Sequence, residues 1–350
     1  MKKYKKFINI IFKVIVFGII AIFICSVLNK IFIPKWSDAT GGASRRIKGI
    51  YNEPKNTIDV AMLGNSDIYS GISTMKLWND AGISSYHISN PSQTVWVSYY
   101  MAKEFYKRQQ PKLVIIDADY VFQTKDSRND IRKTVDCMKF GVNKLSIIAN
   151  PDVRVSKSAR ITYLFPLLRY HSRWSELEEK DFKEGFSKYD SKFGGYELDK
   201  NIKGYNRKSK LKKKEENKKI ERIPKKSKKY LDKILELCKK NNSKVMFVYI
   251  PTDDAWTECK SNLIKQYAEE NNVPYIDYNL DEEFDWKKFG RDEGKHLNTY
   301  GAEYITQKLE ESIKEYNLPN HKNEEQYSKL SPLISVRLLD NLTYSNEVAP

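Results

Sequence analysis

Three short apolar runs constrain the fold of this chain more than any other feature. They are residues Ile58–Leu63, Lys112–Asp117 and Lys244–Ile250. Each is apolar over nearly its whole length, without the alternation of a strand that has one face in water. Strands that are apolar on both faces are typical of parallel sheets covered by helices on both sides. We therefore predict an α/β fold.

Further strand and helix patterns alternate along the chain. Shorter strands are expected at Ser85–Ser89 and Tyr275–Tyr278. This alternation predicts a doubly wound, five-stranded parallel sheet, in which ligands bind beyond the carboxyl ends of the strands. The expected helices begin or lie at Thr74–Asn79, Val95–Arg108, Lys229–Lys240, Leu263–Glu270 and Gly301–Tyr316.

The N-terminal segment predicts a membrane anchor. Four lysines among the first six residues precede the apolar stretch Phe7–Leu28. About 20 apolar residues cross ~30 Å of hydrocarbon, and Lys13 can snorkel toward the other lysines. The positive-inside rule places the N-terminus in the cytoplasm and the chain after Pro34 outside the cell. A cleaved signal peptide is the alternative, but residues 24–27 lack a small-x-small cleavage site, so we favour a single-pass anchor.

The composition along the 350 residues suggests five parts. We expect a basic end and anchor at residues 1–35, a linker at 36–56 and a polar tail at 319–350. The α/β domain would comprise residues 57–120 and 225–318. Residues 121–224 are too long for a simple loop and would form an insertion or lid on the active edge of the sheet.

The charge and the cysteines narrow the function classes. The net charge is +16, and much of it lies in the run Arg207–Lys229. This run has few aromatic residues, which argues against nucleic-acid binding and favours a solvated linker, with attraction to anionic lipid or teichoic acid second. Cys25 lies in the apolar segment, and the other three cysteines show no metal or disulfide spacing. We expect no metal and no cofactor.

Two motifs far apart in the chain could build a nucleophilic site. Leu63-Gly64-Asn65-Ser66-Asp67 follows the first strand, and Asp292-Glu293-Gly294-Lys295-His296-Leu297-Asn298 precedes the last helix. A serine becomes nucleophilic when a histidine takes its proton and a carboxylate orients that histidine. Of the four histidines, His87 lies in a strand and His321 in the polar tail, which leaves His171 and His296 as candidates.

The acid partner of His296 is open between two residues. Glu293 lies three residues before the histidine and Asp292 four before it. Either carboxylate could reach the imidazole if the loop folds tightly. The alternative is an ordinary surface loop before a helix, with Asn298 or Thr299 as the N-cap.

A second cluster lies in the insertion. Arg169, His171, Arg173 and Trp174 could form a subsite, with the arginines binding phosphate or uronate and the indole stacking on a sugar ring. The alternative is a helix in which Leu167, Leu168 and Trp174 pack inward while the arginines face water.

The two motifs resemble a known family. Gly64-Asn65-Ser66-Asp67 resembles the first block of the SGNH/GDSL hydrolase superfamily, which has a flavodoxin-like sheet. Asp292…His296-Leu297-Asn298…Gly301-Ala302…Thr306 resembles its last block. The segments 90–96 and 111–116 are similar to the DltD-like branch that serves cell-envelope polysaccharide O-acetylation.

The resemblance implies Ser66 as the nucleophile, His296 as the base and an acid just upstream. The family places its acid where this chain has Glu293, and Asp292 would need a one-residue bulge that Gly294 permits. The oxyanion hole would use mainly the backbone N–H groups of Ser66 and Asp67. Asn90, Ser92 or Gln93 could replace the glycine that the family has in its second block.

The function implied is an extracytoplasmic acyltransferase or esterase. It would act on a cell-wall or capsular glycopolymer carrying O-acetyl or D-alanyl esters, through an acyl-serine intermediate. The branch also implies a membrane-bound O-acyltransferase as a partner. The alternative is a catalytically degenerate sheet that binds glycopolymer or scaffolds an envelope assembly.

Overall fold

The computed structural model describes residues 2–36, 42–126, 128–153, 155–188, 193–203, 222–252 and 256–327. The chain divides into two compact units, which we describe separately. One comprises residues 1–35 and 155–188, and the other comprises residues 36–154 and 189–350.

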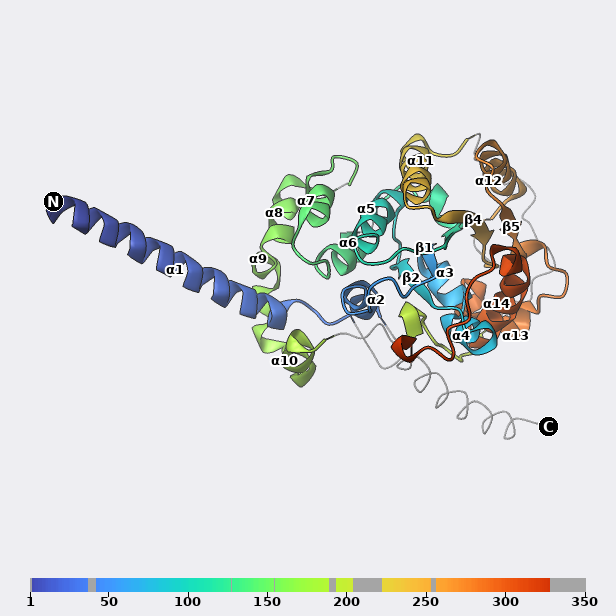
Figure 1. Ribbon diagram of the computed structural model, residues 1–350, viewed down its shortest axis with the longest axis horizontal. Coiled ribbons are helices and arrows are strands. Elements are labelled where there is room, and N and C mark those ends of the chain that lie inside the picture. The colour runs from blue at the N-terminus through green and yellow to red at the C-terminus, as the bar shows by residue number, and fades with distance from the viewer. Residues whose placement is uncertain are drawn as a thin grey trace. The chain divides into compact units, whose positions relative to one another are not determined.

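The larger unit is built on a five-stranded parallel sheet with the order β2-β1-β3-β4-β5 (Figure 1). This confirms the predicted fold class. The first three strands are buried along their whole length, because helices cover both faces. The strands are β1 (Val60–Gly64), β2 (Ser85–Ser89), β3 (Leu113–Asp117), β4 (Lys244–Tyr249) and β5 (Tyr275–Asp277).

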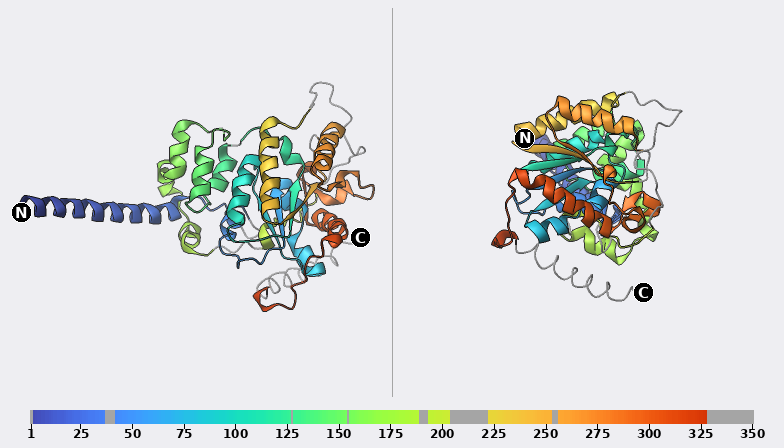
Figure 2. Two further views of the ribbon diagram at one scale, coloured as in Figure 1. Left: turned by 45° about the horizontal axis from the view of Figure 1, so that its top comes forward. Right: turned by 90° about the vertical axis from the view of Figure 1, so that its right-hand side faces the viewer.

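Helices form a layer on each side of this sheet (Figure 2). Helices α3 (Ser66–Gly71), α4 (Thr74–Ala81) and α14 (Thr299–Ile313) pack on one face, where Ile68, Leu77 and Ile305 share a buried core with strand residues. Helices α5 (Val95–Phe105), α11 (Lys225–Lys240) and α12 (Glu258–Glu270) cover the other face. Rings of α5 and α12 contact β2 and β4 there, through the pairs Tyr86–Phe105 and Phe247–Tyr267.

Smaller elements complete this unit. A two-residue antiparallel ladder joins β6 (Gly290–Arg291) to β7 (His296–Leu297), and the sequence had not predicted it. The short helices are α2 (Ala43–Gly49), α6 (Arg128–Val135), α7 (Val142–Ala149) and α13 (Trp286–Phe289). The 3₁₀ turns are η1 (Asp119–Phe122), η3 (Phe193–Gly195), η4 (Tyr278–Leu280), η5 (Asp292–Gly294), η6 (Lys314–Tyr316) and η7 (Glu325–Tyr327).

The smaller unit contains α1 (Lys2–Phe32), α8 (Lys157–Leu164), α9 (Leu167–Tyr170), η2 (His171–Ser175) and α10 (Glu179–Phe186). Within the described residues, α1 is the one helix long and apolar enough to cross a membrane, over Tyr4–Phe32. By length and composition, this helix fits a membrane anchor or a signal sequence.

The unit boundaries differ from the expected domains. The expected insertion is divided, because residues 155–188 group with α1 whereas residues 121–154 and 193–203 group with the sheet. The expected linker contains α2, in which Arg46 and Ile47 are buried. The start of the expected tail also packs on the sheet unit, since Tyr327 stacks on Trp78. Residues 37–41, the basic run at 207–221 and the tail at 328–350 lie outside the described residues.

Candidate active site

Ser66 lies at the carboxyl end of the sheet. Strand β1 ends at Gly64 and α3 begins at Ser66, with Asn65 as the N-cap whose side chain accepts a hydrogen bond from the Asp67 N–H at 2.9 Å. A Cβ on Gly64 would lie only 2.7 Å from the Cβ of Asp117 on the neighbouring strand. Glycine therefore allows the turn to pass close to β3, and it exposes the first residue of α3 at the edge where doubly wound folds bind ligands.

The structure brings Asp292 to the imidazole of His296. The distance from Asp292 Oδ2 to His296 Nδ1 is 3.1 Å. Three consecutive residues, Asp292, Glu293 and Gly294, have positive φ angles of 53°, 61° and 86°. This left-handed run supplies the extra residue that the four-residue spacing requires. The Glu293 backbone N–H instead donates to the carbonyl of Lys203 at 3.2 Å.

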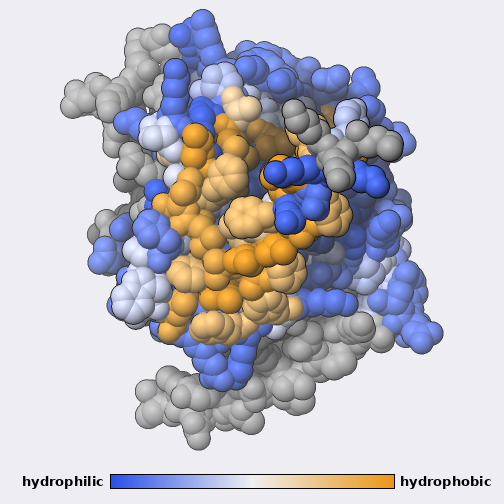
Figure 3. Space-filling model, turned by 90° about the vertical axis from the view of Figure 1, so that its left-hand side faces the viewer, coloured by the Kyte–Doolittle hydropathy of each residue, from blue (hydrophilic) through white to orange (hydrophobic). Residues whose placement is uncertain are grey.

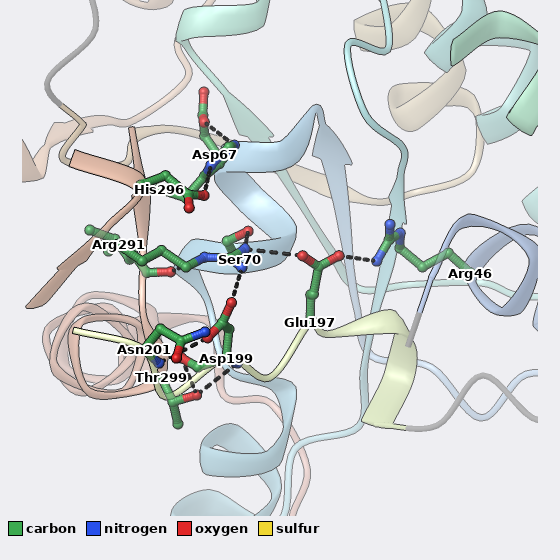
Figure 4. A network of polar contacts seen from close by, with 11 residues as sticks. Arg46, Asp67, Ser70, Glu197, Asp199, Asn201, Arg291, His296 and Thr299 are labelled. Carbon is green, nitrogen blue, oxygen red and sulfur yellow. Dashed lines mark hydrogen bonds and ion pairs between the residues drawn. The ribbon is translucent and has the colours of Figure 1, made fainter. Parts of the chain in front are cut away.

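The second ring nitrogen of His296, Nε2, is directed toward α3. His296 Nε2 lies 3.9 Å from Asp67 Oδ1, and Asp67 is the residue directly after Ser66 (Figure 4). The Asp67 side chain is buried, whereas the His296 side chain retains 26% of its exposure. The imidazole is therefore oriented through Nδ1, and its Nε2 lies near the residue that follows Ser66. A general base needs one oriented nitrogen and a second nitrogen close to the hydroxyl that loses its proton.

Arg291 connects the histidine loop to the serine helix (Figure 4). Its guanidinium donates to Ser70 Oγ of α3 at 2.9 Å, and its Nε donates to the carbonyl of Leu297 at 3.1 Å. It also pairs with Glu197 at 3.0 Å and with Asp199 at 2.6 Å. The nearly buried Arg291 side chain therefore joins β6, β7 and α3 to residues 196–203. We call residues 196–203 the acidic strap, after Glu197 and Asp199.

The acidic strap is fixed along its length. The Glu197 N–H donates to the carbonyl of Tyr69 at 3.1 Å, and the Glu197 carboxylate accepts from Arg46 at 3.3 Å. At the other end, the Lys203 N–H donates to the carbonyl of Gly290 at 3.1 Å. The strap could not be predicted from the sequence because its partners are up to 151 positions away. The one available signal was the pair of acids two residues apart, which an extended segment places on one face.

The structure directs the side chains of two expected oxyanion residues into the interior of the fold. The Asn90 side chain donates to Thr134 Oγ1 at 2.9 Å, and the Gln93 amide donates to the Ile88 carbonyl and to Ser98 Oγ. Both side chains are buried and serve the interior of the fold. The Asp67 N–H is already bonded to Asn65. The N–H of Ser66 belongs to the first turn of α3, whose N–H groups have no carbonyl partner within the helix.

A buried acid lies behind the serine turn. Asp117, the last residue of β3, is fully buried, and burial raises the pKa of its carboxyl group well above the usual value. Its Oδ1 accepts from the Asp119 N–H at 3.3 Å, and its Oδ2 has no hydrogen-bond partner among the described residues. From the sequence, Asp117 was expected only as the end of a strand.

The second predicted cluster lies in the smaller unit, and its arginines and histidine bind other residues of that unit. Arg169 bonds to Thr162 and lies over the ring of Tyr163, and Arg173 bonds to the carbonyl of Phe32 and to Asp181. His171 Nδ1 lies 3.1 Å from the Leu167 carbonyl. The Trp174 side chain is 73% exposed, so it does not pack inward.

Within the described residues, no group of three or more His, Cys, Asp or Glu side chains is arranged to hold a metal ion. No protein-family model and no curated protein matches the sequence.

Two solved structures show a weak likeness. A Bacteroides fragilis protein described as a "putative acylhydrolase" is 12% identical, covers 82% of this chain and 100% of its own, and has a TM-score of 0.35. A Bacteroides thetaiotaomicron protein described as a GDSL-like lipase is 13% identical, covers 73% of this chain and 87% of its own, and has a TM-score of 0.34. Likenesses of this strength carry no weight for the activity of this chain.

Proposed function

We propose that this protein is a membrane-anchored serine acyltransferase or esterase that acts outside the cell on ester groups of a cell-envelope glycopolymer. One observation carries the proposal. His296 binds Asp292 through Nδ1 and directs Nε2 at the turn that holds Ser66 and Asp67.

The reaction would proceed in two halves. Ser66 Oγ attacks the acyl carbonyl carbon while His296 Nε2 takes the hydroxyl proton. The tetrahedral intermediate collapses when the leaving oxygen accepts that proton from the imidazolium, which leaves an acyl-Ser66 ester. A sugar hydroxyl or water then attacks this ester, with His296 again acting first as base and then as acid. The products are an acylated acceptor and free Ser66.

Charge near the imidazole supports this proton transfer. The imidazolium that forms in each half would lie between the carboxylates of Asp292 and Asp67. Two carboxylates would stabilise the positive ring that forms during the transfer, and the hydrogen bond from Nδ1 to Asp292 fixes the orientation of the imidazole. The Ser66 N–H would contribute to binding the oxyanion.

The substrate class and the partner are proposed from the apolar helix α1 and from the sequence resemblance. The apolar helix α1 and the lysines in its first turns support anchoring with the catalytic unit outside. The sequence resemblance to polysaccharide O-acetylation proteins supports an O-acetyl or D-alanyl ester. A membrane-bound O-acyltransferase partner would deliver the acyl group.

The experiment follows the acyl-enzyme. The full chain in liposomes is mixed with an activated acetate ester, quenched, and examined by intact mass and peptide mapping. We expect acetylation at Ser66 that disappears in Ser66→Ala and persists in Ser172→Ala, a matched change at an exposed serine. Addition of teichoic acid or a capsular fragment then shows whether the acetyl group moves to sugar or to water. A folded protein that never acylates Ser66 would contradict the proposal.

A non-catalytic scaffold is the second candidate. The inward-directed amides of Asn90 and Gln93 and the occupied N–H of Asp67 favour it, because they leave few oxyanion donors. A scaffold predicts that Ser66→Ala leaves glycopolymer binding and cellular function intact. Loss of function in that variant would exclude it.

A further inference from the structure

Residues 155–188 form a collar around the end of α1, within the smaller unit. The guanidinium of Arg173 donates to the carbonyl of Phe32, and the Leu167 N–H donates to Asn29 Oδ1 at 3.2 Å. Lys35 Nζ donates to the carbonyls of Ile31 and Ile33 at 2.9 and 2.6 Å. The last carbonyls of a helix lack partners within it, so these cations cap α1.

The collar is held to α1 by more than capping. Lys35 pairs with Asp181 of α10 at 3.5 Å, and neither side chain is exposed. Arg173 adds a second cation to the same carboxylate at 3.1 Å. A Cβ on Gly185 would lie 2.7 Å from the Lys30 carbonyl oxygen, so glycine at this position allows α10 to approach the backbone of α1.

The position of the collar along α1 sets its depth. The apolar stretch Phe7–Leu28 is ~33 Å long at 1.5 Å per residue, which matches the ~30 Å hydrocarbon core of a bilayer. If that stretch fills the core, Asn29–Lys35 lies at the outer boundary between acyl chains and headgroups. The collar is attached to these residues and therefore lies at the same level.

The collar exposes large apolar side chains. Phe182 and Phe186 are four residues apart in α10, so they lie on one helical face. Ile161 of α8 and Phe165, the residue after α8, are exposed as well. Figure 3 looks along the molecule from the side of α1 and shows a large apolar area, to which α1 itself contributes. The exposed members of the collar are Ile161 (55%), Phe165 (60%), Leu168 (56%), Trp174 (73%), Phe182 (49%) and Phe186 (55%).

We propose that the collar is a membrane-interface module, with these apolar side chains inserted into the outer leaflet around α1. The inference rests on the membrane anchoring in the proposed function and not on its chemistry. Water-exposed surfaces rarely carry this many large apolar side chains together. Short helices with apolar faces lie in the bilayer interface, where tryptophan is enriched and lysine and arginine stems reach back to the headgroups.

The experiment measures the depth of single spin labels. The exposed Cys25 and Cys259 are replaced by serine, and the buried Cys137 and Cys238 remain. A label is placed at Phe165→Cys or Phe182→Cys, and at Leu280→Cys as a control, since Leu280 is an exposed apolar residue of the sheet unit. The full chain is reconstituted in phosphatidylcholine–phosphatidylglycerol liposomes, and collisions with oxygen and with a water-soluble nickel chelate are compared.

We expect oxygen to dominate at positions 165 and 182 and the nickel chelate to dominate at position 280. Nickel access at 165 and 182 would overturn the proposal, and so would exclusion of both reagents, which indicates a protein contact. A second readout needs no cysteine. Brominated lipid should quench the part of the tryptophan fluorescence that Trp174→Phe removes, and absence of this quenching would also overturn the proposal. Ser66 acylation in the same liposomes reports separately on the proposed function.

Discussion

Two clusters of this protein have similar composition and different surroundings. Each contains a histidine with charged neighbours, at His296 in the sheet unit and at His171 in the smaller unit. The His296 imidazole is bonded to a carboxylate on one side and faces the serine turn on the other. The His171 imidazole lies 3.1 Å from the backbone carbonyl of Leu167. Of the nearby arginines, Arg173 caps α1 and Arg169 binds Thr162 of the same unit.

The comparison shows that residue type alone does not identify a catalytic group. A histidine serves as a general base when one nitrogen is oriented and the other faces a proton donor. The arginines near His171 have their donors directed at carbonyls and at Asp181, which fits the end of a membrane helix better than a substrate subsite. Three predictions test this distinction, and a fourth concerns the stability of the sheet unit.

The largest difference is expected between the two histidines. His296→Ala should lower the rate of Ser66 acylation by about 10²- to 10⁴-fold, the usual contribution of a general base. His171→Ala should leave that rate unchanged within about twofold, since its ring contacts no group of the site. Stopped-flow acylation with an activated acetate ester measures both. Equal losses in the two variants would remove the distinction between the clusters.

The two acids before His296 should also differ. Asp292→Asn removes the carboxylate bound to Nδ1, and we expect the rate of acylation to fall by about 10²-fold. The loss is smaller than for a buried triad acid because the Asp292 side chain is 56% exposed and partly screened by water. Glu293→Gln should change the rate by less than about twofold. A larger effect at Glu293 would mean that the loop rearranges when substrate binds.

Arg291 should act as a positioning residue. Arg291→Gln loosens the link between α3 and the histidine loop, and kcat should fall by about tenfold while KM changes little. The matched variant Arg173→Gln weakens the cap on α1 and should leave kcat unchanged. A purely structural role for Arg291 would lower the amount of folded protein without altering kcat per folded molecule, which active-site titration distinguishes.

A third histidine extends the comparison to stability. Burial lowers the pKa of His87 from 6.5 to about 3, so the folded state holds this ring neutral. Because the pKa of His87 is lower in the folded state than in the unfolded state, its contribution to the free energy of unfolding is complete above pH 6.5. This contribution is lost as the pH falls toward 3. The loss between pH 6.5 and 5 should be about 2 kcal/mol. Urea unfolding of the wild type and of His87→Asn checks this, and the variant should show a flatter pH dependence.

The sheet could be predicted because its signals are local. The runs that became β1, β3 and β4 are apolar throughout, and α11 and α14 repeat apolar residues at helical spacing. Burial of continuous apolar runs allows few architectures, and a parallel sheet covered by helices on both faces is the one that alternating helices and strands favour.

The details of the site could not be predicted because they depend on contacts distant in sequence. Arg291 binds Glu197 and Asp199, which are 94 and 92 positions away in the sequence. Such pairs cannot be predicted from polar residues that show no periodicity. The choice between Asp292 and Glu293 depended on three left-handed residues, of which only Gly294 gave a signal. Arg173 looked like a ligand-binding residue because the carbonyl to which it donates, that of Phe32, lies in α1 and is 141 positions away.

The most direct measurement is labelling of the full chain in liposomes with a serine-directed fluorophosphonate, followed by peptide mapping. The account predicts modification at Ser66 in the wild type and in His171→Ala, and its loss in His296→Ala. A folded protein without modification at Ser66, or with equal modification in His296→Ala, would contradict the claim that His296 and Asp292 activate this serine.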